Sequence, residues 1–417
     1  MALSAFIGSV TTPTVTGNYS VAGVGFQPSL MLTFNNSVLG VGSTRHGDLS
    51  IGFVAGNSLT SIIACQNADA LGTTDMTNSH WSQRAIEAND YTTGPARADL
   101  RSFDADGFSL TYGTVVTGTS YSVEYVALGG TDITNVVVGS FLVATSTGAQ
   151  SVAGIGFKPN AMLFSSGVAQ TGAAQASAAG VEQFMGWATS STSQSASSWV
   201  DRDAQADGRA KSWLNSANCI LKLGQLGVSN AVASLTSFDA NGFTVNWSTI
   251  VAAAQTSMVY YLAVSGGQWF VGQFLQATST GVQNVTGVGF IPGAILFTSQ
   301  NKVAAVTTSN NYQTTLGAAV SATQRFSLWA GARNTSDPTE ADKYLTQSNV
   351  IALLTTTATP VVSSLADFSS FDTDGFTINW STVNSIIQPV VSFLAVGANA
   401  VGGVTTTQDL ASYIFTG

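Results

Sequence analysis

The sequence predicts an all-β protein made of three tandem β-sandwich domains with a jelly-roll-like arrangement. Two sequence signatures each occur three times, the short apolar runs end at turn residues, and no long segment keeps helical periodicity. A repeat of about 135 residues with many short strands has the size of one β-sandwich or jelly roll. Each unit is expected to bury its own core, unlike the much shorter repeats of solenoids.

The composition supports a folded chain and excludes several classes of protein. The 417 residues are 45% hydrophobic and only 8% charged, against roughly 25% charged in an average soluble protein. With 13 basic and 22 acidic residues and no basic run, nucleic acid is excluded as a partner. Every apolar run is too short for a membrane span, and the first residues lack the basic region of a secretory signal.

The first signature is Gly-x-Gly-Phe-x-Pro. It occupies residues 23–28, 154–159 and 287–292. A dinucleotide-binding fingerprint needs Gly at the sixth position and a helix after it, whereas here the sixth position is Pro and a strand is expected. The signature therefore predicts a turn into a strand, and no nucleotide cofactor.

The second signature is Ser-Phe-Asp-x-(Asp/Asn)-Gly-Phe. It occupies residues 102–108, 237–243 and 370–376, and its first Phe follows the Phe of the first signature by 77, 81 and 81 residues. Because the two markers keep step, the chain divides into repeats. These are unit 1 (1–131), unit 2 (132–266) and unit 3 (267–399), followed by a C-terminal tail (400–417).

Each second signature predicts a tight hairpin, since Asp opens a type I turn and Gly three positions later takes positive φ. The predicted turn residues are Asp104 with Gly107, Asp239 with Gly242, and Asp372 with Gly375. The pattern also matches the start of a calcium loop, but Val115, Ile250 and Val383 stand where an EF-hand needs Glu. The hairpin is preferred over a weak metal site, and no metal or other cofactor is expected.

Aromatic residues recur around these hairpins. The flanking Phe pairs, with Trp247 and Trp380 four residues later, are expected to pack in the core, and a sugar-binding platform is the alternative. A further recurrent aromatic, also assigned to the core, is expected at Phe53, Trp187 and Trp329. Three aromatics that do not recur are candidates for contact surfaces: Trp81, Trp213 and Trp269.

The sequence contains few residues suited to catalysis. Its two histidines, His46 and His80, both lie in unit 1, and no Gly-x-Ser-x-Gly elbow occurs. Cys65 and Cys219 are expected to be free, buried thiols. Carboxylates in residues 201–203 and 340–343 could pair for glycoside hydrolysis, but solvated loop charge is preferred, and no enzyme is predicted.

The middle of each unit differs from its framework. Residues 45–101, 182–222 and 302–343 carry 25 of the 35 charged residues and match one another poorly. A repeated framework around variable segments is typical of a scaffold that presents loops, so contacts with a partner are expected there.

The Gly-Phe-x-Pro turns, the Phe-Asp-x-(Asp/Asn)-Gly-Phe hairpins and the aromatic strands that close the units resemble an uncharacterised β-rich module of tailed-bacteriophage virion proteins. The resemblance covers essentially the whole chain in three copies. Such modules usually have a Val/Ile-Trp-Ile-Lys-like strand after the Pro, where this chain has residues 161–164, Ala-Met-Leu-Phe.

The resemblance implies a non-enzymatic structural protein of the virion, assembled in the cytoplasm of the host bacterium. Its implied partners are other virion proteins, namely the major capsid protein or tail proteins, and further copies of itself. Because the repeats start at the first residue without an anchoring helix or shaft, we expect a capsid-surface decoration protein whose repeats form a pseudo-threefold cluster. The alternatives are a tail-associated fibre or receptor-binding protein that recognises host glycan, and a secreted glycan hydrolase.

The tail is expected to make an assembly contact. It contains one charged residue, Asp409, and the apolar run Tyr413, Ile414 and Phe415. An extended apolar segment without a following domain can pair with a neighbouring subunit through its free backbone groups.

Overall fold

The computed structural model describes residues 3–38, 42–56, 59–166, 175–251, 257–303, 309–357 and 359–399. These residues form β-strands and no helix, so the predicted all-β class is confirmed. Accordingly, this part of the chain has no helix long and apolar enough to cross a lipid bilayer. The tail, with Tyr413, Ile414 and Phe415, lies outside the described residues.

The strands follow the same order in each unit. Unit 1 contains β1 (Ser4–Thr11), β2 (Gly17–Ala22), β3 (Pro28–Asn35), β4 (Gly42–Arg45), β5 (Leu49–Gly56), β6 (Leu59–Asn67), β7 (Met76–Ser82), β8 (Ile86–Asp90), β9 (Gly94–Asp104), β10 (Gly107–Thr114) and β11 (Ser122–Gly129). Unit 2 contains β12 (Asn135–Leu142), β13 (Gly148–Ala153), β14 (Ala161–Ser166), β15 (Gln175–Ala179), β16 (Val181–Ala188), β17 (Gln194–Asp201), β18 (Lys211–Asn215), β19 (Ile220–Leu223), β20 (Ser229–Asp239), β21 (Gly242–Ile250) and β22 (Met258–Ser265). Unit 3 contains β23 (Gln268–Leu275), β24 (Gly281–Thr286), β25 (Pro292–Ser299), β26 (Ser309–Asn310), β27 (Tyr312–Ala319), β28 (Arg325–Ala332), β29 (Ala341–Thr346), β30 (Ile351–Leu354), β31 (Val362–Asp372), β32 (Gly375–Thr382) and β33 (Val390–Gly397).

Each unit forms a large and a small antiparallel sheet. In unit 1 the large sheet has the order β1-β11-β3-β5-β6-β7 and the small sheet the order β2-β10-β9-β8. The corresponding strands of units 2 and 3 repeat both orders. A separate apolar cluster fills the space between the two sheets of each unit, as in a β-sandwich.

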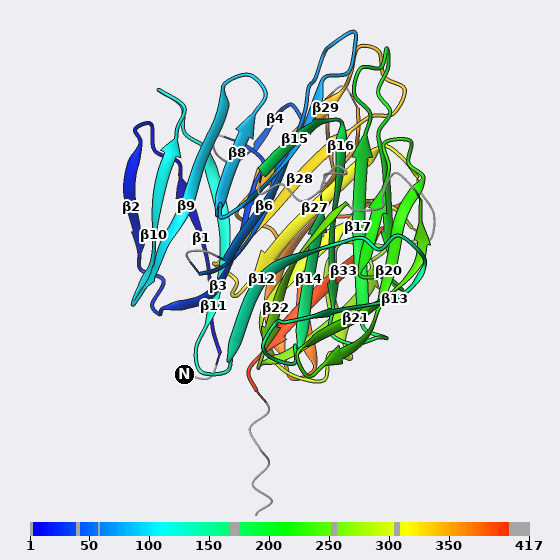
Figure 1. Ribbon diagram of the computed structural model, residues 1–417. Coiled ribbons are helices and arrows are strands. Elements are labelled where there is room, and N and C mark those ends of the chain that lie inside the picture. The colour runs from blue at the N-terminus through cyan, green and yellow to red at the C-terminus, as the bar shows by residue number, and fades with distance from the viewer. Residues whose placement is uncertain are drawn as a thin grey trace, which may run out of the picture.

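The seventh strand of every large sheet comes from another unit. Strand β15 of unit 2 pairs with β7 of unit 1, β26 of unit 3 pairs with β18 of unit 2, and β4 of unit 1 pairs with β29 of unit 3. Figure 1 shows β15 beside the strands of unit 1 and β4 close to β29. The exchange is cyclic, so the three units form a closed ring.

A core shared by all three units lies on the other face of the large sheets. In β3, for example, Leu30, Leu32 and Phe34 point into the shared core, whereas Met31 points into the core of unit 1. Because side chains alternate along a strand, a strand with both faces buried reads as a continuous apolar run. This explains the short apolar runs of the sequence.

The expectation that each unit buries its core without a neighbour is therefore wrong. Phe34 of unit 1 packs against Phe326 of unit 3 with 5.6 Å between ring centroids, and Trp187 of unit 2 belongs to the same cluster. Each large sheet has apolar side chains on both faces. The small sheet of the same unit covers one face, so the other face is buried only by the neighbouring units.

Neighbouring units also cover backbone groups on the outer strands of two large sheets. The Gln324 side chain of unit 3 accepts a hydrogen bond from the Ile7 amide of β1. The Ser193 hydroxyl of unit 2 accepts one from the Val271 amide of β23 at 2.9 Å and donates one to the Val271 carbonyl at 3.0 Å. Unpaired strand edges are sites of unwanted pairing between chains, so these contacts protect the ring.

Candidate functional site

The predicted turn residues lie where the sequence placed them, at the hairpin between the last two strands of each small sheet. Gly107, Gly242 and Gly375 have φ of +138°, +153° and +146°. A Cβ on Gly242 would lie 2.0 Å from the Val152 carbonyl oxygen, and the other two glycines meet an equivalent oxygen at the same distance. The position therefore requires glycine because of both backbone conformation and space.

The turn aspartates are held within their own hairpins. Asp104 accepts hydrogen bonds from the hydroxyls of Ser102 and Ser109 at 2.7 and 2.6 Å, and these bonds lower its pKa. Asp239 and Asp372 accept bonds from equivalent hydroxyls. Within the described residues, no group of three or more His, Cys, Asp or Glu side chains could hold a metal ion.

The two signatures, found separately in the sequence, contact each other. The Asp106 carboxylate of the unit 1 hairpin accepts hydrogen bonds from the amides of Gly23 and Gly25 at 3.1 and 2.6 Å. Both glycines have φ near +85°, so their amides converge on one acceptor. The Asp374 carboxylate accepts both equivalent bonds in unit 3, whereas in unit 2 Asn241 accepts one with its side-chain oxygen and one with its backbone carbonyl.

Trp247 and Trp380 are buried, as predicted for core residues. Each is 1% exposed, and its indole N–H donates to a glutamine on the neighbouring strand, Gln150 or Gln283, at 2.7 Å. The candidate contact residues Trp81, Trp213 and Trp269 are half-buried.

The predicted equivalence of Phe53, Trp187 and Trp329 is wrong, although all three are buried. Phe53 and Trp187 lie on β5 and β16, opposite Leu32 and Leu163. The residue at this position in unit 3 is Ala318 on β27, and Trp329 lies on the next strand. Because the middle segments match poorly in sequence, the sequence alone does not show which residues occupy equivalent strand positions.

Cys65 and Cys219 are free and buried, as predicted. Burial raises the pKa of both thiols, so neither is a reactive thiolate. His80 is buried and packs against Tyr260 of unit 2, with 5.2 Å between ring centroids.

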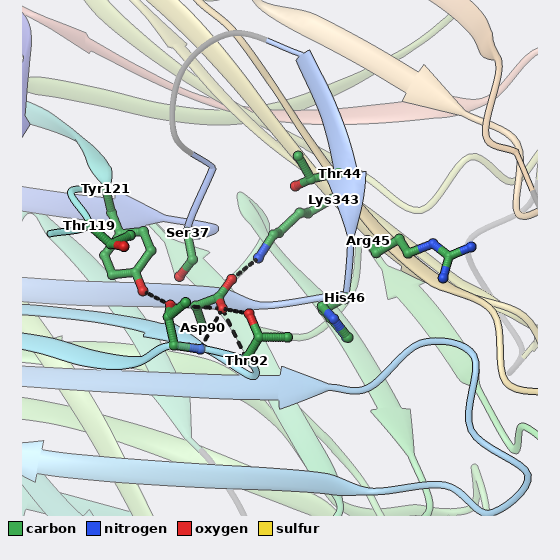
Figure 2. Close-up of a pocket in the computed structure, with 10 residues that line it drawn as sticks. Ser37, Thr44, Arg45, His46, Asp90, Thr92, Thr119, Tyr121 and Lys343 are labelled. Atoms are coloured by element: carbon green, nitrogen blue, oxygen red, sulfur yellow. Dashed lines mark hydrogen bonds and ion pairs between the residues drawn. The ribbon is translucent and has the colours of Figure 1, made fainter. Parts of the chain in front are cut away.

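A polar cavity of about 290 Å³ lies at the junction of units 1 and 3 (Figure 2). The loop after β3, the loop after β8, the donated strand β4 and the edge strand β29 contribute its walls. Its lining residues are Ser37, Thr44, Arg45, His46, Asp90, Thr92, Thr93, Thr119, Tyr121 and Lys343. Side chains from two units line it, and it contains a buried cation, which makes it a candidate site.

Lys343 connects the two units at this cavity. Its ammonium group lies 2.6 Å from Asp48 Oδ2 and 3.0 Å from Asp90 Oδ2, and its side chain is only 2% exposed. Burial raises the pKa of Asp48 to about 7 despite this ion pair. Burial acts in the same direction on Asp90, but Lys343 and nearby hydroxyls outweigh it, so its pKa lies well below the usual range.

The donors around Asp90 are supplied by its own turn. Its Oδ1 accepts hydrogen bonds from the amides of Thr92 and Thr93, both at 3.0 Å, and from both hydroxyls. Thr93 in turn contacts the Tyr121 hydroxyl. Figure 2 shows these bonds converging on the Asp90 carboxylate. Both of its oxygens are therefore occupied.

His46 lies on the wall of the cavity with φ of +69°. Its Nδ1 accepts a hydrogen bond from the Asp69 amide at 3.0 Å, and its ring packs against Tyr91. Burial and the charge of Lys343 lower its pKa. The Ser37 hydroxyl donates to the Asn89 carbonyl. The Lys343 ammonium and the carboxylates of Asp48 and Asp90 thus form a network that connects units 1 and 3 beside the cavity.

Some carboxylates of the charged middle segments contact other units of the same chain. Asp201 of unit 2 accepts a bond from Asn67 of unit 1 at 2.9 Å, and Asp203 accepts one from the Met76 amide. Of the two proposed carboxylate pairs, the one in residues 201–203 is therefore occupied by contacts with unit 1, while Glu340 of the other pairs with Arg333 of its own unit. The sequence could not reveal this, because no motif marks which unit each loop will meet.

Comparison with known proteins does not assign the chain to a family. No protein-family model and no curated protein matches it. Among solved structures, the Macrobrachium rosenbergii nodavirus aligns at 12% identity over 63% of this chain and 84% of the other, with a TM-score of 0.13. A β-fructofuranosidase from Schwanniomyces occidentalis aligns at 8% identity over 91% and 99%, with a TM-score of 0.12. At such TM-scores, neither likeness carries an argument.

Proposed function

We propose that this chain is a non-enzymatic structural protein of a tailed-bacteriophage virion that decorates the capsid surface. In this proposal its units are three jelly-roll-like β-sandwich domains that together act as a pseudo-trimer. The observation that carries it is the cyclic exchange of β4, β15 and β26, which links three similar units into a closed ring. The assignment to a phage virion comes from the resemblance of the repeats to a module of phage virion proteins.

A closed ring of three similar units fits a threefold or quasi-threefold position on a shell. Each unit can offer a similar surface to one of three identical capsid subunits, as in oligomers that share a symmetry axis. The repeated features, namely the hairpins and the Gly-x-Gly turns, lie on the small sheets, where all three units are alike.

The arrangement of the polar residues supports a structural role. At the junction cavity, Asp90 is occupied by its own turn and by Lys343, and the Ser37 hydroxyl donates to a backbone carbonyl. A general base or nucleophile must instead be within reach of a substrate proton or reacting atom. The polar groups of the cavity instead bond to one another and to the backbone, and these contacts stabilise the ring.

The alternative is a tail-associated fibre or receptor-binding protein that recognises host glycan. Two polar surface cavities of about 360 and 410 Å³, one near Arg202 and one near Lys302, favour this candidate, because small-molecule sites have volumes in this range. The cavity near Arg202 is lined mainly by residues of the variable middle segment of unit 2.

The test is to locate the chain on purified particles of the phage that encodes it. We expect the protein in the virion by mass spectrometry, and cryo-microscopy should place one three-lobed density at each threefold or quasi-threefold position of the head. Density on the tail alone would favour the receptor-binding alternative. Absence from particles, or hydrolysis of host polysaccharide by the purified protein, would contradict both.

A further inference from the structure

A basic pocket lies beside the junction of units 2 and 3. Its volume is about 360 Å³, and it is open to solvent. Its walls are the loop between β17 and β18, the loop after β19, and the loop between β28 and β29 of unit 3. Its lining residues are Arg202, Gln205, Arg209, Lys211, Gln225, Leu226 and Asn334.

The charge of this pocket is opposite to that of the chain. Three of the 13 basic residues line it and no acidic residue does, in a protein with a net charge of −9. Among the described residues, no carboxylate lies within ion-pairing distance of Arg202 or Lys211. Arg209 pairs with Asp207 at 2.8 Å, but its side chain is 49% exposed, so this pair is weak.

The loop that carries the two arginines is fixed by a buried carboxylate beneath it. Asp201 Oδ1 accepts hydrogen bonds from the amides of Arg202 and Arg209 at 2.9 and 3.0 Å. Lys211 contacts the side chain of Asn310 on the donated strand β26. The cations are therefore carried by backbone that is held in place before any ligand arrives, which reduces the entropy lost on binding.

Amide side chains supply the rest of the polar lining. Gln225 donates to the Ala179 carbonyl at 2.9 Å, and Gln205 donates to the carbonyls of its own loop. The side-chain oxygen of Asn334 is buried and has no hydrogen-bond partner within the described part of the chain.

We propose that this pocket binds an acidic saccharide, whose carboxylate or phosphate group contacts Arg202, Arg209 and Lys211 while its hydroxyls contact the amide side chains. Arginine presents a planar set of donors that matches an oxyanion, and such charge-assisted hydrogen bonds are among the strongest in proteins. The site does not depend on whether the chain belongs to a virion.

The cavity at the junction of units 1 and 3 provides an internal comparison. There the buried cation, Lys343, is neutralised by Asp48 and Asp90 of the same chain. In the pocket beside units 2 and 3, Arg202 and Lys211 have no carboxylate partner among the described residues, and Arg209 has only an exposed pair with Asp207. An external anion therefore takes the place that carboxylates of the chain occupy at the other junction.

The test is titration calorimetry of the full chain with three probes at low salt: tetragalacturonate, a neutral oligosaccharide of the same length, and inorganic phosphate. We expect saturable binding of tetragalacturonate that weakens with added salt, and none of the neutral oligosaccharide. Arg202→Gln should weaken binding about tenfold or more. The matched control is Arg101→Gln, which removes an exposed arginine on β9, outside the pocket, and should change affinity less than twofold.

The outcomes separate the sources of the anion. Phosphate binding as tight as that of tetragalacturonate, with the same loss in Arg202→Gln, would overturn the saccharide and leave a site for a free oxyanion. No saturable binding of either anion, or equal effects of Arg202→Gln and Arg101→Gln, would overturn the site itself. Equal melting temperatures of the two variants would show that both are folded.

Discussion

The small-sheet hairpin of each unit, with the Gly-x-Gly turn and the buried aromatic beside it, is called the frame here. The frame is similar in all three units, whereas the contacts at the junctions between units are not. The hairpin accepts the hydrogen bond of the second glycine of the Gly-x-Gly turn in all three units, and the buried tryptophan beside the hairpin has an equivalent glutamine partner in units 2 and 3. At the junctions, by contrast, the edge strands that receive a donated strand differ: Lys343 of β29 lies beside two carboxylates, whereas Ser212 of β18 donates a hydrogen bond to the Asn311 carbonyl. Equivalent substitutions should therefore have equal costs in the frame and unequal costs at the junctions.

The largest effect is expected for the buried tryptophans of the frame. Replacing Trp247 or Trp380 by Ala should lower the free energy of unfolding by about 3–5 kcal/mol, because each change leaves a cavity and removes the partner of a glutamine. Chemical denaturation should give the same loss for both within about 1 kcal/mol. Wild-type stability with a loss of carbohydrate binding would instead support an aromatic platform.

Unequal costs should appear at the junctions. Lys343→Met should lower the free energy of unfolding by about 3–5 kcal/mol, because it leaves the buried Asp48 carboxylate without its cation. Ser212→Ala should cost only about 1 kcal/mol, since it removes a neutral hydrogen bond to the Asn311 carbonyl and leaves no charge unpaired.

The charge of Asp48 can be tested separately from the packing of Lys343. Adding Asp48→Asn to Lys343→Met should restore part of the stability, because it removes the unpaired charge. Equal losses for Lys343→Met and Ser212→Ala in urea titrations would remove the proposed difference between the junctions.

A smaller loss is expected at the hairpin glycines. Gly242→Ala should lower stability by about 1–3 kcal/mol, because φ is +153° and the added Cβ would meet the Val152 carbonyl. Gly375→Ala has the same geometry and serves as a second measurement. A melting temperature unchanged in both variants would mean that the hairpin relaxes without cost.

The smallest effect concerns pH at the contact between units 1 and 2. Burial raises the pKa of Asp201 from 3.8 to about 7, so the folded chain holds a proton that the unfolded chain releases. Its contribution to stability is therefore complete below about pH 4 and is lost as the pH rises through about 7.

Asp201→Asn should flatten this dependence. The variant should gain stability relative to the parent as the pH rises from 5 to 8, because only the parent loses the bound proton over this range. Asn67 can rotate its amide to pair with the new side chain, since its oxygen has no other partner in the described chain. Parallel stability curves for variant and parent between pH 5 and 8 would show that Asp201 is ionised throughout this range.

The frame could be predicted from the sequence because its causes are local. Gly107, Gly242 and Gly375 are required by the turn itself, and alternating or continuous apolar runs reveal whether one or both faces of a strand are buried. The thrice-repeated spacing also fixed the order of the units along the chain.

The tertiary structure decided how the units meet. Which strand is exchanged, and which carboxylate meets Lys343, depends on contacts between residues about 250–300 positions apart, and no local propensity encodes such contacts. Likewise, the sequence marked Asp106 and the Gly-x-Gly turn as separate motifs, and only the folded small sheet brings the carboxylate to those amides. The physical reason is that a hydrogen bond or ion pair between distant residues forms only after packing of the sheets has fixed both partners.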